Sequence, residues 1–122
     1  MLSVKNLVKI YKSKKAESVT ALNDVSIDFP ETGFVFLLGK SGSGKSTILN
    51  LMAKMYEAES GEVLIDGNNI NDLSKETLRK TFSLVNQFPY IFDMTIKENL
   101  LLAKAGATDE EINNALHLAS LD

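Results

Sequence analysis

Glycine, serine and lysine are concentrated in one short stretch, Gly39 to Ser46, which reads GKSGSGKS. Glycines reach positive φ and let a backbone approach an anion closely, so that successive N–H groups converge on it. A lysine beside such a nest adds a positive charge, and a neighbouring hydroxyl can bind a divalent cation. The spacing satisfies G-x-x-x-x-G-K-[ST], which indicates binding of nucleotide phosphates together with Mg²⁺.

Each position of this stretch has an expected role. Lys45 is the candidate catalytic charge for the β- and γ-phosphates, and Ser46 is the candidate Mg²⁺ ligand. Thr47 is expected to hydrogen-bond a more proximal phosphate, whereas Lys40 occupies a variable position and is expected to be exposed. The complete set of candidate cofactor-binding positions in the loop is Gly39, Ser41, Gly42, Ser43, Gly44, Lys45, Ser46 and Thr47.

A phosphate loop must be held between a strand and a helix, and the flanking sequence predicts both. Phe34–Leu38 is a continuous apolar run bounded by glycines, typical of a strand buried on both faces of a parallel sheet. Apolar residues recur at helical spacing after the loop, which predicts a helix over Lys45–Met55. This context argues against a Gly/Ser-rich linker that matches the motif by accident.

The rest of the chain predicts a mixture of strands and helices. The stretches that begin at Thr95 and Thr108 each place a glutamate three residues after the threonine, which is the pattern of a helix capping box. Further strands are predicted at Leu2–Tyr11, residues 25–29, Glu62–Ile65 and Thr81–Val85, and a further helix at Ser74–Lys80.

Composition bounds the possible functions. The 122 residues carry a net charge of −3, which argues against a nucleic-acid binder that relies on phosphate contacts. The chain has no cysteine, so disulfides and thiolate metal sites are excluded. We interpret five early lysines as a solvated strand and loop rather than a polyanion site; they are Lys5, Lys9, Lys12, Lys14 and Lys15.

Four further segments narrow the class of phosphate-binding protein: residues 20–26 (TALNDVS), 60–67 (SGEVLIDG), 84–87 (LVNQ) and 91–100 (IFDMTIKENL). In this order they resemble the nucleotide-binding domain of ATP-binding cassette (ABC) transporters. The resemblance implies an α/β fold: a P-loop NTPase (RecA-like) core with an antiparallel β subdomain and the start of a helical subdomain, truncated. It also implies an ATP-binding subunit that couples ATP binding and hydrolysis to movement of a substrate across a membrane.

The resemblance maps residues 1–122 onto the N-terminal half of one such ATPase domain. Residues 1–33 and 60–70 correspond mainly to the β subdomain, and residues 34–58 to the strand and helix around the phosphate loop. Residues 81–94 correspond to the segment called the Q-loop. Residues 95–122 correspond to the start of the helical subdomain.

Three residues outside the loop acquire roles from the resemblance. Tyr11 would stack on adenine, with an ordinary strand tyrosine as the alternative. Val19 would pack against the nucleoside, with plain burial as the alternative. Gln87 would be the Q-loop glutamine that reaches Mg²⁺ and the attacking water. The aromatic residues Phe88, Tyr90 and Phe92 would lie near the transmembrane permease, or would fill a junction between subdomains.

The implied partners are a permease domain or subunit and a second ABC ATPase domain. The implied location is cytoplasmic, at the inner face of the cell membrane through the permease. An ABC-type head of a DNA-repair or chromosome-maintenance protein is the main alternative, but such heads usually carry a long coiled-coil insertion after the Q-loop. A small-metabolite kinase would leave Tyr11 and the Gln87–Asn99 stretch unexplained.

The 122 residues contain no LSGGQ-like signature, no strand ending in an Asp-Glu pair and no switch histidine. His117 is expected to lie on the surface of the last helix. We therefore expect the chain alone to hydrolyse ATP negligibly. In the family, the strands that carry the Asp-Glu pair and the switch histidine lie between the strand of Phe34–Leu38 and the strand of Thr81–Val85. Without them we expect these two strands to have open edges, and we expect the chain to self-associate there.

Overall fold

The structure is a computed structural model that describes residues 1–121. Its contacts divide the chain into two compact units, an N-terminal unit over Met1–Leu84 and a C-terminal unit that begins at Val85. Within residues 1–121, no helix has the length and apolar content needed to cross a membrane.

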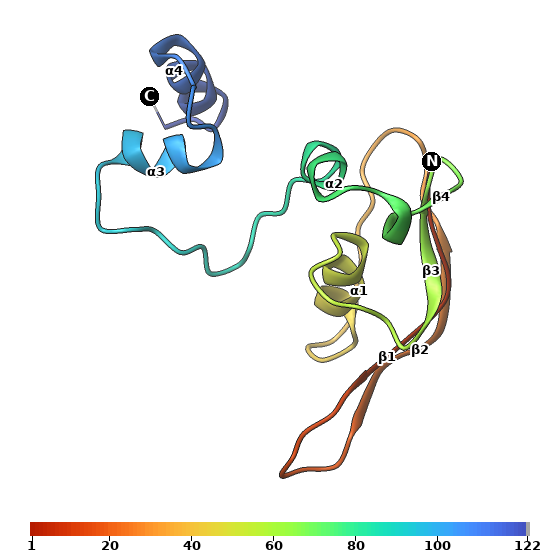
Figure 1. The fold of residues 1–122 in the computed structure, drawn as a ribbon. Coiled ribbons are helices and arrows are strands. Elements are labelled where there is room, and N and C mark those ends of the chain that lie inside the picture. The colour runs from red at the N-terminus through yellow and green to blue at the C-terminus, as the bar shows by residue number, and fades with distance from the viewer. Residues whose placement is uncertain (122) are drawn as a thin grey trace. The chain divides into compact units, whose positions relative to one another are not determined.

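The N-terminal unit is built on one antiparallel sheet with the strand order β2-β1-β3-β4 (Figure 1). β1 and β2 form a long hairpin in which Ser3 faces Asp28 at one end and Tyr11 faces Val19 at the other. β1 pairs with β3 only as far as Val8, so the end of the hairpin has no third strand. The strands are β1 (Leu2–Tyr11), β2 (Val19–Asp28), β3 (Ser60–Ile65) and β4 (Asn68–Asn69).

Helix α1 (Lys45–Met52) packs its apolar side against this sheet. Ile48, Leu51 and Met52 recur at the spacing of one helical face, and all three are buried. They join Val4 and Leu7 of β1, which are the most deeply buried side chains. The same core contains Leu22, Val63, Ile70 and Leu78. This contact holds the N-terminus of α1, and therefore the phosphate loop, against the sheet.

The predicted helix over Lys45–Met55 is three residues too long. Lys54 adopts φ +54°, a left-handed conformation that ends a helix. The N–H of Met55 then donates to the carbonyl of Asn50 at 2.8 Å and satisfies one of the last carbonyls. A short 3₁₀ turn (Ile70–Asp72) and helix α2 (Lys75–Thr81) follow β4, and the Ser74 hydroxyl caps α2.

Two strand predictions are wrong in this structure. Phe34–Leu38 forms no strand, and Phe34, Phe36 and Leu38 are 80–93% exposed. The predicted strand Thr81–Val85 begins inside α2 and continues without strand pairing. A buried parallel strand requires a hydrogen-bonded neighbour on each side. No segment within residues 1–121 pairs with either run.

The C-terminal unit contains helices α3 (Ile96–Ala103) and α4 (Asp109–Leu118). Both predicted capping boxes are confirmed, with Thr95 and Glu98 in one and Thr108 and Glu111 in the other. Asn99 holds the preceding turn, because its side chain accepts from the N–H of Phe92 at 2.9 Å and donates back to the Phe92 carbonyl at 3.1 Å. Ile112 is the buried residue of α4, as its predicted apolar face requires.

Candidate nucleotide-binding site

The loop from Gly39 to Gly44 has the backbone conformations that its glycines were expected to provide. Gly42 has φ +81° and Gly44 has φ +91°, where side-chain-bearing residues are strained. A Cβ atom on Gly44 would lie 2.8 Å from the carbonyl oxygen of Ala21 in β2. Gly44 is therefore required twice, by its own torsion and by its close approach to the neighbouring strand.

Gly44 is also the N-cap of α1, where it provides no side-chain acceptor for the first-turn N–H groups. These groups lack partners inside the helix. The first turn contains no acidic side chain, and the charged residues from Gly39 to Thr47 are Lys40 and Lys45. The positive end of the helix dipole, the free N–H groups and the ammonium of Lys45 therefore suit a bound anion.

Lys45 folds back over the loop. Its Nζ donates to the carbonyls of Gly39 at 2.6 Å and Lys40 at 2.8 Å, and to the Ser43 hydroxyl at 3.2 Å. An ammonium group has three donors, so all three stabilise the loop itself. The N–H of Ser43 also donates to the Lys40 carbonyl at 3.2 Å, which closes the turn. The charge of Lys45 is thus held within the loop, next to the helix N-terminus.

The structure places Tyr11, Val19 and Thr47 together, although they are distant in sequence. Tyr11 and Val19 are cross-strand partners at the end of the hairpin. The Tyr11 hydroxyl donates to the Thr47 hydroxyl at 3.4 Å, which links the hairpin to the first turn of α1. Tyr11 is 37% exposed and Val19 is 61% exposed. An aromatic ring and an apolar side chain therefore border the side of α1 that carries the phosphate loop.

Sequence reasoning missed two residues that contact Tyr11. The Tyr56 ring lies perpendicular to the Tyr11 ring, with 6.2 Å between centroids. The Nζ of Lys9 lies 5.5 Å from the centroid of the Tyr11 ring. Lys9 was interpreted as one of five solvated lysines, but its side chain is only 14% exposed. The sequence did contain a signal for this contact: Lys9 lies two residues before Tyr11, and residues two apart in a strand lie on the same face.

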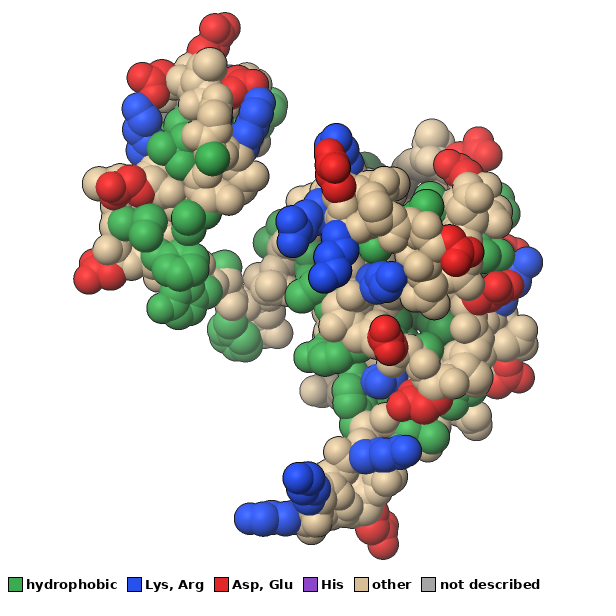
Figure 2. All heavy atoms as spheres, in the orientation of Figure 1, with side chains coloured by type: hydrophobic (Ala, Val, Ile, Leu, Met, Phe, Trp, Pro, Cys, Tyr) green, Lys and Arg blue, Asp and Glu red, His purple; other side chains and the backbone are tan. Residues whose placement is uncertain are grey.

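The other early lysines match the interpretation of a solvated strand and loop. Lys5, Lys12, Lys14 and Lys15 are exposed. Figure 2 shows basic side chains gathered at the free end of the β1–β2 hairpin, together with an acidic one.

Gln87 lies in the C-terminal unit, so its role as a ligand of Mg²⁺ stays a prediction. Among residues 1–121, no three His, Cys, Asp or Glu side chains are grouped to hold a metal ion. The oxygen donor near the phosphate loop is instead the exposed hydroxyl of Ser46, in the first turn of α1. Hydroxyl oxygen suits Mg²⁺ that is bound mainly by substrate phosphates.

An open hollow of about 590 Å³ lies on the N-terminal unit, between the end of α1 and α2. Apolar side chains line much of it: Met55, Tyr56, Leu78, Phe82 and Leu84. Met55 is 62% exposed and Leu84 is 40% exposed, so apolar surface remains uncovered here.

Comparison with known proteins identifies the family. The sequence profile of the family described as ABC transporter matches residues 22–122. The chain belongs to the ABC transporter family. The matched range includes the whole phosphate loop and Gln87, whereas Tyr11 and Val19 precede it.

The relatives of this ABC chain include proteins described as putative multidrug export ATP-binding/permease proteins. A putative multidrug export ATP-binding/permease protein of Staphylococcus aureus strain NCTC 8325 is 41% identical over 99 residues, covering 81% of this chain and 17% of the relative. The protein of the same description in the bovine strain RF122 is 40% identical over the same coverage. The chain thus spans less than a fifth of the length of these relatives. They favour a transporter ATPase over a DNA-repair head.

Solved structures agree with this assignment. A dimeric ATP-binding cassette in a post-hydrolysis state, bound to ADP and Pi, is 35% identical and has a TM-score of 0.72. The dimeric structure of a bacterial ABC transporter cassette has a TM-score of 0.74 at the same identity. Both alignments cover 96% of this chain and 55% of the solved one. The chain therefore has part of the P-loop NTPase fold of an ABC ATPase.

Proposed function

We propose that this chain binds the nucleotide of an ABC transporter ATPase, and that in the complete protein ATP binding and hydrolysis drive movement of a substrate across a membrane. The observation that carries this proposal is the phosphate loop. Gly44 leaves the N-terminus of α1 without a cap, and Lys45 holds its charge beside it. No side-chain carboxylate of the loop competes for that position.

The residues of the loop would act by binding and orientation. The backbone N–H groups of Gly42 and of residues 44–47 would hold the phosphates, and Lys45 would exchange hydrogen bonds to loop carbonyls for bonds to phosphate oxygens. Ser46 would hold Mg²⁺, and Gln87 is its second candidate ligand. When bound, Mg²⁺ would neutralise negative charge on the phosphates during phosphoryl transfer.

The base of the nucleotide would stack on Tyr11. A partly exposed ring at the end of the hairpin, tied to Thr47 of α1, lies beside the loop that would hold the phosphates. Offset stacking on a purine suits such a ring. Val19, the cross-strand partner of Tyr11, would cover the nucleoside from the other strand.

Coupling to transport would require a permease and a second ATPase domain. The apolar hollow next to α2 ends at Leu84, three residues before Gln87, and supports contact of a permease with this side of the N-terminal unit. Such contact would place the chain at the cytoplasmic face of the membrane. The dimeric cassettes that it resembles support a second ATPase domain as partner.

We expect the 122 residues alone to bind MgATP without turning it over at a rate typical of the intact family. Phosphoryl transfer needs several positioned groups at once. In this chain the candidate groups are the phosphate loop and Gln87. Sustained release of phosphate by the purified chain would contradict this expectation.

Titration calorimetry with MgATP tests the phosphate loop. Lys45→Ala should weaken binding about tenfold or more, because a hydrogen bond to a charged group contributes about 1.5–3 kcal/mol. Lys40→Ala is the matched control, since it removes an exposed lysine at a variable position of the same loop. Equal affinities for Lys45→Ala and the unmodified chain would refute the proposal.

A further inference from the structure

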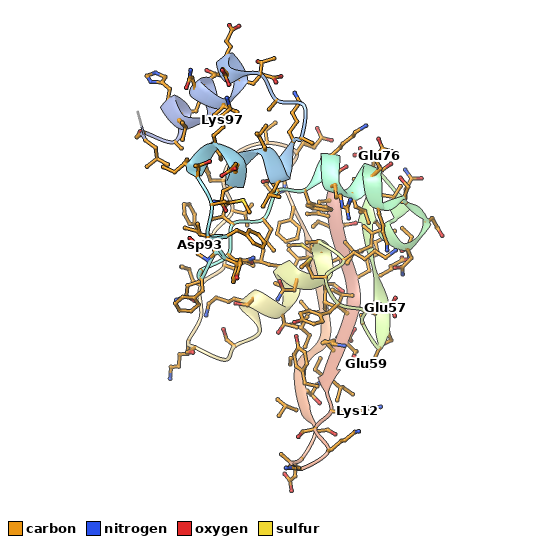
Figure 3. All side chains as sticks on the ribbon, turned by 60° about the vertical axis from the view of Figure 1, so that its left-hand side comes forward. Lys12, Glu57, Glu59, Glu76, Asp93 and Lys97 are labelled. Atoms are coloured by element: carbon orange, nitrogen blue, oxygen red, sulfur yellow. The ribbon has the colours of Figure 1, made fainter. Side chains whose placement is uncertain are left out.

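A small polar network joins the end of β1 to the segment between α1 and β3. Lys9 is its centre: its Nζ donates to the Glu57 carbonyl at 2.7 Å and to a Glu59 carboxylate oxygen at 3.4 Å. The other oxygen of Glu59 accepts from the N–H of Ile10 at 2.8 Å. Figure 3 shows Glu57 and Glu59 alongside the hairpin, with Lys12 farther toward its free end.

The same lysine touches the ring proposed to stack on the base. Its ammonium lies 5.5 Å from the centroid of the Tyr11 ring, within the range of a cation–π contact. Tyr56, from the segment that carries Glu57 and Glu59, meets that ring at 89°. The Tyr11 ring is therefore contacted both from its own strand and from the segment after α1.

This network lies where the sheet stops supporting the hairpin. Pairing of β1 with β3 ends at Val8, so within residues 1–121 the strand neighbour of Lys9, Ile10 and Tyr11 is β2. A two-stranded ribbon is marginally stable on its own. The bonds of Lys9 and Glu59, the Tyr56 contact and the hydrogen bond from Tyr11 to Thr47 help to tie this end of the hairpin to the rest of the unit.

We propose that Lys9 and Glu59 form a clamp that positions the Tyr11 ring for the nucleotide base. The inference rests on the proposed stacking of the base on Tyr11. Lys9 would act as a positioning residue, because its side chain contacts the Tyr11 ring and the segment after α1. A ring held in place before binding avoids the entropy cost of ordering it when the nucleotide arrives.

The electrostatics of the network agree with this role. The Ile10 N–H lowers the pKa of Glu59 below its ordinary value of 4.5, and the charge of Lys9 acts in the same direction. Glu59 is therefore ionised at neutral pH and can hold the ammonium group. The Lys9 side chain is 14% exposed and that of Glu59 is 33% exposed, so the ion pair is partly screened from water.

The test compares two ligands by titration calorimetry, MgATP and magnesium tripolyphosphate, which lacks a base. Lys9→Met keeps an unbranched side chain as far as Cε and removes the ammonium group. Its affinity for MgATP should fall about threefold to tenfold, whereas its affinity for tripolyphosphate should stay within about twofold. Lys9→Arg should retain binding of MgATP, and Lys12→Met, in the exposed hairpin end, is the matched control.

Tyr11→Ala separates this inference from the proposed function. It should lower MgATP affinity without changing tripolyphosphate binding, and adding Lys9→Met to it should cause no further loss. If Tyr11→Ala binds MgATP normally, the stacking proposal fails and the clamp fails with it. If Tyr11→Ala loses affinity while Lys9→Met does not, the clamp alone is wrong.

Two further results would also overturn the clamp. Equal losses of both ligands by Lys9→Met would mean that the residue supports the whole site rather than the ring. If Lys9→Met does not fold, Glu59→Gln decides the question, because its amide oxygen still accepts from Ile10 but lacks the charge that holds Lys9. Unchanged MgATP affinity in Glu59→Gln would then refute the proposal.

Discussion

Replacing Gly44 by alanine tests why the phosphate loop needs a glycine at the start of α1. Gly44 and Gly42 both have positive φ, +91° and +81°, so alanine is strained at either position. The surroundings differ. A Cβ on Gly44 would lie 2.8 Å from the Ala21 carbonyl oxygen and 3.0 Å from Leu22, whereas a Cβ on Gly42 would have nothing within 4 Å. Gly42→Ala is therefore the matched control for torsional strain.

The two substitutions should differ by the cost of the contact with β2. Left-handed torsion costs an L-residue about 1–2 kcal/mol, and this applies to both variants. Overpacking against a backbone carbonyl and a core leucine adds about 1–3 kcal/mol at Gly44 only. We expect the free energy of unfolding to fall by about 2–5 kcal/mol in Gly44→Ala and by about 1–2 kcal/mol in Gly42→Ala.

Urea denaturation, followed by the amide NMR signals of Ile48 and Leu51, measures this for the N-terminal unit specifically. With a denaturant slope of about 1–3 kcal/mol/M, the midpoint of Gly44→Ala should lie about 1 M below that of Gly42→Ala. Equal midpoints would show that α1 can move away from β2 at no cost. A lower midpoint for Gly42→Ala would refute the assignment of the contact.

Two further predictions concern other parts of the chain. The hydrogen bonds from Lys104 and from the Thr108 N–H lower the pKa of Glu111. Because the pKa of Glu111 is lower in the folded chain than the unfolded value of 4.5, the ionised carboxylate stabilises α4 at pH values above 4.5, and this stabilisation is lost as the pH falls through the folded pKa. A Glu111 pKa of 4.5 or higher, measured by NMR titration, would contradict this prediction. Phe36→Asp should reduce concentration-dependent self-association in sedimentation velocity without lowering unfolding stability, because Phe36 is 80% exposed. An unchanged sedimentation profile would show that the exposed apolar run Phe34–Leu38 does not mediate self-association.

Elements with a local cause were predictable from sequence. The capping boxes at Thr95 and Thr108 form because each threonine and its glutamate satisfy one another's backbone N–H groups. β1 was predicted over the range observed, and Gly42 and Gly44 of the phosphate loop have the positive φ that was expected of its glycines. The family was also recognisable, because several short segments match in the same order.

The strands at Phe34–Leu38 and Thr81–Val85 were mispredicted for a physical reason. An apolar run shows that a segment favours burial, but a strand exists only when another segment supplies its hydrogen bonds. Within residues 1–121, no segment pairs with either run. The end of α1 shows the same limit on a smaller scale, since the left-handed Lys54 stops a helix whose apolar spacing continues to Met55.

The phosphate loop follows from residue types and spacing, because its chemistry depends on backbone torsion and on one adjacent lysine. The surroundings of Tyr11 do not follow from residue types and spacing, because they depend on long-range packing. Val19 lies opposite Tyr11 because of the hairpin register, and Thr47 meets its hydroxyl because α1 docks on the sheet. Lys9 is held at the ring by bonds to the segment before β3. A lysine that sequence reasoning places in solvent is held against the ring, because the fold supplies a carbonyl and a carboxylate at that point.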